Sequence, residues 1–158
     1  MKKLFIIPLC FSLFFTSCND EEEAVIPVVS ELDADMRGDW TNTAVERVYY
    51  STSDEVMYAD TSKRQANFHF DGQKMTVTLP GSSDKDVWKY SFPDPNDSTY
   101  IRLQRDTATT DYIITSMSGN EMIWVDEIDW AGYPEEVPDE EKTTSRRGVY
   151  TWKFVRKQ

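Results

Sequence analysis

Residues 67–80 read Asn-Phe-His-Phe-Asp-Gly-Gln-Lys-Met-Thr-Val-Thr-Leu-Pro, and this stretch decides the fold class. Apolar and polar side chains alternate on both sides of Asp71-Gly72. An alternation with a period of two puts one set of side chains on each face of a strand. Asp-Gly is a strong signal for a tight hairpin turn. The stretch therefore predicts two antiparallel strands with one buried face and one solvated face.

Similar strands, separated by turn residues, follow one another along most of the chain. A short helix is expected first, because Ser30 is followed three residues later by an acid and Gly38 ends the pattern. The polar segments 51–65 and 130–145 are interpreted as long loops, the second of them acidic. The expected strands are 40–50, 67–70, 75–79, 87–92, 100–105, 112–117, 122–128 and 148–156.

Eight short strands at hairpin spacing predict an all-β domain over residues 30–158, in one piece and with a single core. An antiparallel up-and-down eight-stranded barrel is favoured, because closure removes the exposed edges of a sheet. A β-sandwich is the alternative. In both cases the short helix is expected to precede the strands along the chain.

The first residues have the pattern of a secretory signal. Lys2 and Lys3 precede an apolar run from Leu4 to Phe15, which is too short to span a bilayer as a helix. Thr16-Ser17-Cys18 then resembles a lipoprotein signal box. This resemblance implies that residues 1–17 are removed as a signal peptide and that Cys18 carries lipid. The alternative is a plain secreted protein with an incidental cysteine.

The segment after Cys18 is acidic. A run of like charges is usually solvated, so residues 18–29 are expected to form a lipidated acidic tether. The run also resembles the export signal of surface lipoproteins of the Bacteroidetes. That resemblance implies an outer-membrane protein, lipid-anchored through Cys18 and facing the cell exterior, with the inward-facing leaflet as the alternative. The residues of the export signal are Asn19, Asp20, Glu21, Glu22 and Glu23.

Charge and cysteine content exclude several functions. The net charge of −11 is unsuited to nucleic acid, whose phosphates require Lys and Arg. Cys10 leaves with the signal peptide and Cys18 is lipidated. The mature chain is therefore expected to have no thiol for a disulfide, a zinc ion or nucleophilic attack.

Gly38-Asp39-Trp40 follows the expected helix and opens the first strand. It resembles the Gly-x-Trp signature of the lipocalins, eight-stranded barrels in which this tryptophan closes one end. The long segment after the first strand and Thr110-Asp111-Tyr112 at a later turn are similar to further features of that family. Arg156 matches the basic residue that stacks on the tryptophan, a contact that contributes about 1 kcal/mol. The usual disulfide and the helix after the last strand are missing, so the chain most resembles the lipocalin-like lipoproteins of the Bacteroidetes.

Groups for catalysis are sparse. His69 is the only histidine and is expected on the solvated face of its strand, and no nucleophile or orienting acid is apparent near it in sequence. No phosphate loop, zinc spacing or serine elbow appears. The carboxylates between Asp126 and Glu141 are interpreted as a solvated loop. A calcium site or paired catalytic carboxylates are the alternatives. We therefore predict no enzyme, no catalytic residue, no metal and no cofactor.

Aromatic residues on the strands give the leading functional hypothesis. They either fill the core or line a cavity suited to an apolar or sugar ligand. The sequence thus predicts a non-enzymatic, surface-tethered barrel that binds a small apolar or aromatic-stacking ligand. The alternative is a filled barrel that acts as a protein-interaction module, either an accessory subunit of an outer-membrane complex or an inhibitor. The ligand-binding candidates are Trp88, Tyr90, Tyr100, Tyr112 and Trp124.

Overall fold

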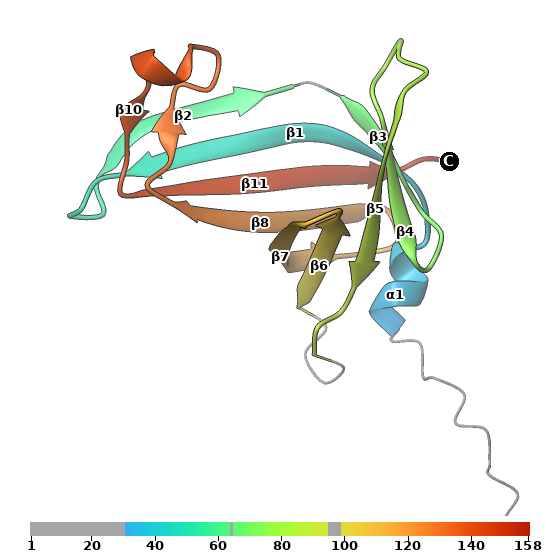
Figure 1. The fold of residues 1–158 in the computed structure, drawn as a ribbon. Coiled ribbons are helices and arrows are strands. Elements are labelled where there is room, and N and C mark those ends of the chain that lie inside the picture. Colours follow the sequence, from blue (N-terminus) through green and yellow to red (C-terminus); the bar gives the residue numbers. More distant parts are fainter. Residues whose placement is uncertain (1–30, 64, 95–98) are drawn as a thin grey trace, which may run out of the picture.

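The computed structural model describes residues 31–63, 65–94 and 99–158 (Figure 1). The predicted signal peptide, the predicted lipidation site Cys18 and the predicted acidic tether lie outside these residues. Among the described residues, no helix is both long enough and apolar enough to cross a membrane.

One antiparallel sheet forms most of the domain and closes on itself. Sequential strands pair with one another around the sheet, and β11 returns to pair with β1. This confirms the predicted all-β, up-and-down eight-stranded barrel rather than a sandwich. A short helix, α1 (Glu31–Met36), precedes it. The barrel strands are β1 (Gly38–Tyr50), β3 (Ala66–Phe70), β4 (Lys74–Thr78), β5 (Lys85–Ser91), β6 (Tyr100–Arg105), β7 (Ala108–Met117), β8 (Glu121–Asp129) and β11 (Arg147–Arg156).

Segment 51–65 is not the loop that its polarity indicated. It contains β2 (Val56–Ser62), which pairs with β1 from Val45 to Tyr50. β3 pairs with the same edge of β1 from Gly38 to Asn42. The two strands therefore follow one another along a single edge. None of the β2 side chains is fully buried, which explains why its sequence lacks the apolar–polar alternation of a half-buried strand.

Two further sequence interpretations are corrected. Segment 130–145 contains a two-stranded sheet, β9 (Gly132–Tyr133) with β10 (Thr143–Thr144), and a 3-10 turn, η1 (Asp139–Glu141). Thr110-Asp111-Tyr112 lies inside β7 and not at a turn. The turn comes earlier, where Asp106 has a φ of 51°.

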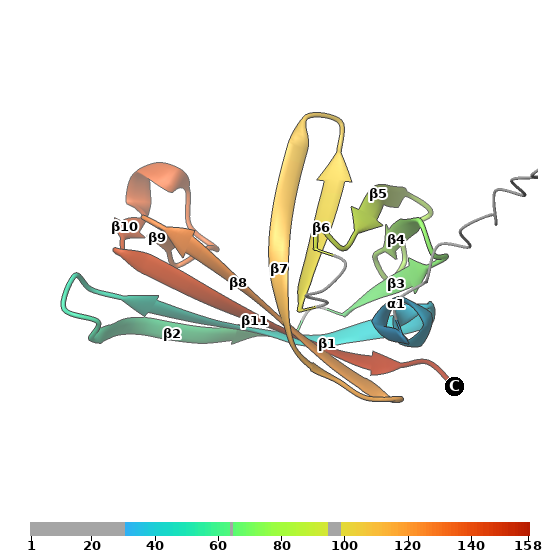
Figure 2. The same ribbon diagram turned by 90° about the horizontal axis from the view of Figure 1, so that it is seen from below.

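The long strands extend past the barrel as an arm. β1, β2, β8 and β11 run together away from α1, and β9, β10 and η1 lie at the far end of this arm (Figures 1 and 2). The arm has its own small core, in which Tyr49, Ala131 and Tyr150 are buried. The main core lies inside the barrel, at the end nearer α1.

Trp40 fills the end of the barrel beside α1. It is fully buried, and its indole Nε1 donates a 2.8 Å hydrogen bond to the carbonyl oxygen of Met36. The guanidinium carbon of Arg156 lies 4.3 Å from the centre of the Trp40 ring. Arg156 also donates hydrogen bonds to the carbonyl oxygens of Asp35, Arg37 and Gly119. The Arg156 side chain of β11 thus connects the end of α1 to Trp40.

Gly38 makes this contact possible. Its φ is +111°, and a Cβ at this position would lie 3.1 Å from Nη1 of Arg156. A residue with a side chain would be strained at that φ and would crowd the guanidinium. The glycine of the Gly-x-Trp motif is therefore required for a steric reason.

We predict that Arg156→Ala lowers the free energy of unfolding by about 2 kcal/mol, because it removes the ring contact and the bonds to the three carbonyl oxygens. Urea denaturation measures the change. Arg102→Ala is the control. Arg102 forms an exposed ion pair with Asp111 on the outside of the barrel, and its loss is expected to have little effect. Equal effects of the two substitutions would contradict the role given to Arg156.

Candidate functional site

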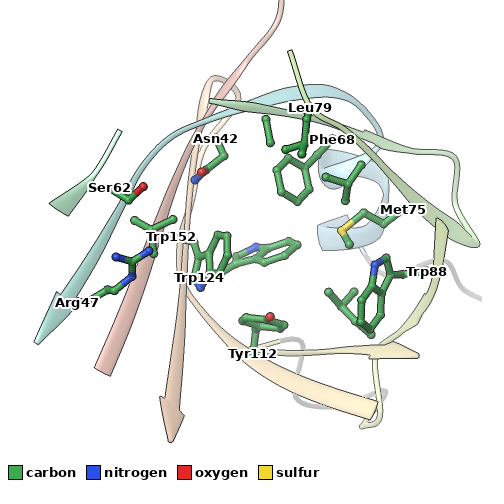
Figure 3. A pocket seen from close by; sticks show the side chains of 14 residues that line it. Asn42, Arg47, Ser62, Phe68, Met75, Leu79, Trp88, Tyr112, Trp124 and Trp152 are labelled. Carbon is green, nitrogen blue, oxygen red and sulfur yellow. The ribbon is translucent and has the colours of Figure 1, made fainter. Parts of the chain in front are cut away.

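A half-open cavity of about 330 Å³ occupies the barrel at the end away from Trp40 (Figure 3). Inner faces of β1, β3, β4, β5, β6, β7, β8 and β11 contribute to its wall. Large side chains such as Phe70, Tyr90 and Phe154 fill the other end. Smaller residues, including Val45 and Ala66, leave space here. The lining residues are Asn42, Val45, Arg47, Ser62, Ala66, Phe68, Met75, Val77, Leu79, Trp88, Leu103, Tyr112, Trp124 and Trp152.

Three of the five ligand-binding candidates line this cavity: Trp88, Tyr112 and Trp124. The ring centres of Tyr112 and Trp124 are 5.5 Å apart. Tyr90 points inward but belongs to the filled end, where its hydroxyl donates a 2.9 Å hydrogen bond to Asp33. Tyr100 is 41% exposed and does not line the cavity. The expectation that it faces the interior is wrong, because Ile101 and Leu103 take the inward positions of β6.

Two further lining residues, Trp152 and Arg47, were not among the predicted candidates. Trp152 lies opposite Trp124 on the neighbouring strand, and its ring centre is 6.3 Å from that of Tyr112. The alternation of Tyr150, Trp152 and Phe154 was a usable signal for it. Arg47 gave no such signal, because a charged residue is not expected on an inner face.

Arg47 sits where the cavity meets the arm and is held by three carboxylates. Its Nη1 lies 3.3 Å from Asp60 of β2, and its Nη2 lies 3.0 Å from Glu135. Glu136 is 3.6 Å away from Nη1. Only 12% of the Arg47 side chain is exposed. A buried guanidinium is costly unless it is paired, so these acids are what allow Arg47 to occupy this position.

Glu135 and Glu136 belong to the segment 131–145, which we call the cover segment. It packs against the inner face of the arm through Tyr133, whose ring stacks on Tyr58 with centres 5.2 Å apart. The Ser145 hydroxyl donates a 2.8 Å hydrogen bond to the carbonyl oxygen of Ala131. The cover segment, which the sequence predicted to be a solvated loop, is therefore only partly solvated. Its outer acids are exposed, while its ends and Tyr133 are packed.

Asp126 adds a further carboxylate beside the cavity. It lies two residues after Trp124 on β8 and pairs with Tyr150, so it faces the same side of the sheet. Burial raises the pKa of Asp126. None of the ion pairs in the described parts of the chain involves it. Burial, together with the nearby Asp126 charge, raises the pKa of Tyr112 to about 12.

His69 takes no part in the cavity. Its side chain is 53% exposed, and Nδ1 lies 2.9 Å from a carboxylate oxygen of Asp39 on the outer surface. This is the solvated position expected from its place between Phe68 and Phe70.

Fold and site together define a small closed β-barrel with an aromatic cavity open toward an acidic arm. No protein-family model matches the chain, and no curated protein matches it.

The raised pKa of Asp126 predicts a pH-dependent change in stability. Because the folded state holds the proton more tightly than the unfolded state, ionisation of Asp126 destabilises the fold at neutral pH. Asp126→Asn should therefore raise the free energy of unfolding at pH 7. The gain should shrink as the pH falls through the raised pKa of folded Asp126, and it should be gone below the ordinary aspartate pKa, where both states are protonated. Urea denaturation at several pH values measures it.

Asp111→Asn is the opposite-sign control. Hydrogen bonding to Arg102 lowers the pKa of Asp111, so ionised Asp111 stabilises the fold above its unfolded pKa. Its removal should lower stability at pH 7 only slightly, because the ion pair is exposed, and that small loss should disappear in acid. A loss of stability for Asp126→Asn at pH 7 would contradict the raised pKa of Asp126.

Proposed function

We propose that this protein is a lipid-anchored outer-membrane lipoprotein whose lipocalin-like barrel binds a small apolar or aromatic-stacking ligand without chemical conversion. One observation carries the binding proposal: the cavity is lined mainly by apolar and aromatic side chains. Its volume of about 330 Å³ lies at the lower end of the roughly 300–1,000 Å³ typical of ligand pockets. A ligand that covers these rings would be removed from water and gain the hydrophobic free energy of burial.

The geometry of the wall supports a flat or ring-containing ligand. Phe68, Trp88, Tyr112, Trp124 and Trp152 surround the space from five different strands. Aromatic faces stack on other rings with a preference for offset or edge-to-face arrangements. The filled end behind Phe70 gives the cavity a fixed floor, so a ligand enters from the side of the arm.

Binding is tested with an environment-sensitive probe, N-phenyl-1-naphthylamine, on residues 30–158. We expect saturable fluorescence enhancement, and a copurifying small molecule in native mass spectrometry would add support. Val77→Trp places a large ring in the cavity and should weaken probe binding by about tenfold or more, equivalent to about 1.4 kcal/mol.

Val87→Trp is the matched control, because Val87 lies on β5 but is 43% exposed on the outside of the barrel. It should bind the probe like the unaltered protein. No saturable enhancement in the unaltered domain, with a bare mass, would overturn the binding proposal. The alternative of a protein-interaction module would then be the one to pursue.

The anchoring proposal rests on Lys2-Lys3, the apolar run and Thr16-Ser17-Cys18. Two or more acyl chains on Cys18 would give a durable tether, since each buried CH₂ contributes about 0.8 kcal/mol. In a Bacteroidetes host, Cys18→Ser should abolish labelling by an alkyne fatty acid and release the protein from the membrane fraction. Replacement of Asp20, Glu21, Glu22 and Glu23 by alanine should leave labelling intact but protect the protein from protease added to whole cells. Unchanged fractionation of Cys18→Ser would refute the lipid anchor.

A further inference from the structure

Side chains on the inner side of the sheet form rows that run across β2, β1, β11 and β8. Directly opposed residues of neighbouring strands have Cβ atoms about 5 Å apart. One row lines the cavity and consists of Ser62, Val45, Trp152 and Trp124. The next row toward the arm, which we call the mouth row, consists of Asp60, Arg47, Tyr150 and Asp126. Each member of the mouth row lies two residues along its strand from a lining residue and therefore shares its face.

The two charged ends of the mouth row differ. At one end Arg47 pairs with Asp60 and with Glu135 and Glu136 of the cover segment. At the other end Asp126 is half-buried and forms no ion pair with any residue that the structure describes. A carboxylate that is partly removed from water without a counter-ion costs free energy. The fold itself therefore leaves this cost at Asp126 without compensation.

Asp126 adjoins the aromatic lining of the cavity. Ile113 of β7 pairs with Val125 of β8, so Tyr112, one residue earlier, lies beside Asp126. Burial and the Asp126 charge together raise the pKa of Tyr112 to about 12, so the carboxylate acts on this ring. The Tyr112 ring in turn lies 5.5 Å from Trp124 and 6.3 Å from Trp152, centre to centre (Figure 3). A carboxylate and a group of aromatic rings thus meet where the cavity opens.

Charge at the mouth favours a cation. The carboxylates around the Arg47 guanidinium outnumber it, because Asp126 adds to the three acids that pair with it. Two further cations near the cavity have acidic partners of their own. Lys142 pairs with Asp139, and Arg105, which stacks on Trp88, pairs with Asp86. A negative field at an opening attracts cations and repels anions, and aromatic rings attract cations as well.

We propose that the cavity takes an amphiphilic amine, whose ammonium group pairs with Asp126 beside the Tyr112 ring while its apolar or aromatic body lies in the cavity. The ammonium group supplies the counter-ion that Asp126 lacks among the described residues, and the body packs on rings such as Trp124 and Trp152. This inference rests on the proposed binding function and adds to it the charge and the orientation of the ligand.

Three naphthalenes that differ in charge test the proposal: 2-naphthylmethylamine, which is a cation at pH 7, neutral 2-naphthylmethanol and anionic 2-naphthoate. Their affinities are measured by displacement of N-phenyl-1-naphthylamine from the mature chain from residue 18 with Cys18→Ser, which retains every described residue. We expect the amine to bind about fivefold more tightly than the alcohol, as a charge pair at a partly exposed site would give. The carboxylate should bind most weakly. Added salt should narrow the difference between amine and alcohol.

Asp126→Asn keeps the size of the side chain and removes its charge. It should lower the affinity for the amine about fivefold, while binding of the alcohol changes little. The variant should fold, because loss of this charge is expected to stabilise the domain.

Glu127→Gln is the matched control. Glu127 is the next residue of β8, points to the outer face and pairs with Arg147 at 3.2 Å. Its substitution removes the same charge from the same strand, but not from the cavity mouth. The ratio of amine to alcohol affinity should therefore stay as in the unaltered protein.

The outcomes separate this inference from the function beneath it. If N-phenyl-1-naphthylamine and the three compounds all fail to bind, the proposed binding function fails. If the probe binds but the alcohol or the carboxylate binds as tightly as the amine, or none of the three displaces the probe, this inference alone is overturned. An amine preference that persists in Asp126→Asn would also overturn it, because another group would then hold the ammonium.

Discussion

The pairing of the first strand with the last is the constraint on which the rest of this structure depends. β1 and β11 are in register from Trp40–Arg156 to Tyr50–Arg147, with one bulge near Thr43. Their backbone bonds turn an antiparallel sheet into a closed barrel and remove two edges. They also bring Arg156 over Trp40. The same strand pairing therefore closes the sheet and places the side chain that covers the end of the barrel. The inside of the molecule, and therefore its cavity, exists only because this pair forms.

The length of β1 divides the molecule into two regions. Its first residues pair with β3 within the barrel, and its later residues pair with β2 along the arm. The filled barrel end, the cavity and the tyrosine cluster of Tyr49, Tyr58, Tyr133 and Tyr150 thus succeed one another along one strand. Arg47 lies between the last two of these regions. Its ion pairs with Glu135 and Glu136 connect the cavity rim to the cover segment, and its ion pair with Asp60 connects the rim to β2.

Acidic residues have different roles in different places. Asp33 is buried at the filled end, where it accepts hydrogen bonds from Arg37 and Tyr90. Glu135 and Glu136 neutralise Arg47, whereas Asp126 is half-buried and forms no ion pair with any residue that the structure describes. Asp139 and its neighbours in η1 are exposed and add to the strongly negative net charge. The same side-chain chemistry therefore supports the fold, sets the charge of the cavity mouth and keeps the outer surface solvated.

The sequence by itself determined the strand alternation, the short helix, the barrel and the Gly38, Trp40 and Arg156 positions. The alternation, the turns and the helix are local, since period-two patterns and turn residues are readable from neighbours in the chain. The barrel was predicted from the number of strands at hairpin spacing, and the roles of Gly38, Trp40 and Arg156 from the resemblance to the lipocalins. Only the tertiary structure decided that residues 56–62 form a strand, that segment 130–145 packs on the arm, and that Trp152 and Arg47 line the cavity while Tyr100 does not. β2 has no fully buried side chain and is held by backbone bonds to β1, so the pattern of its side chains does not reveal it. Which side chains meet across the cavity depends on the register between strands far apart in sequence, and the space that remains between them depends on how all those side chains pack together.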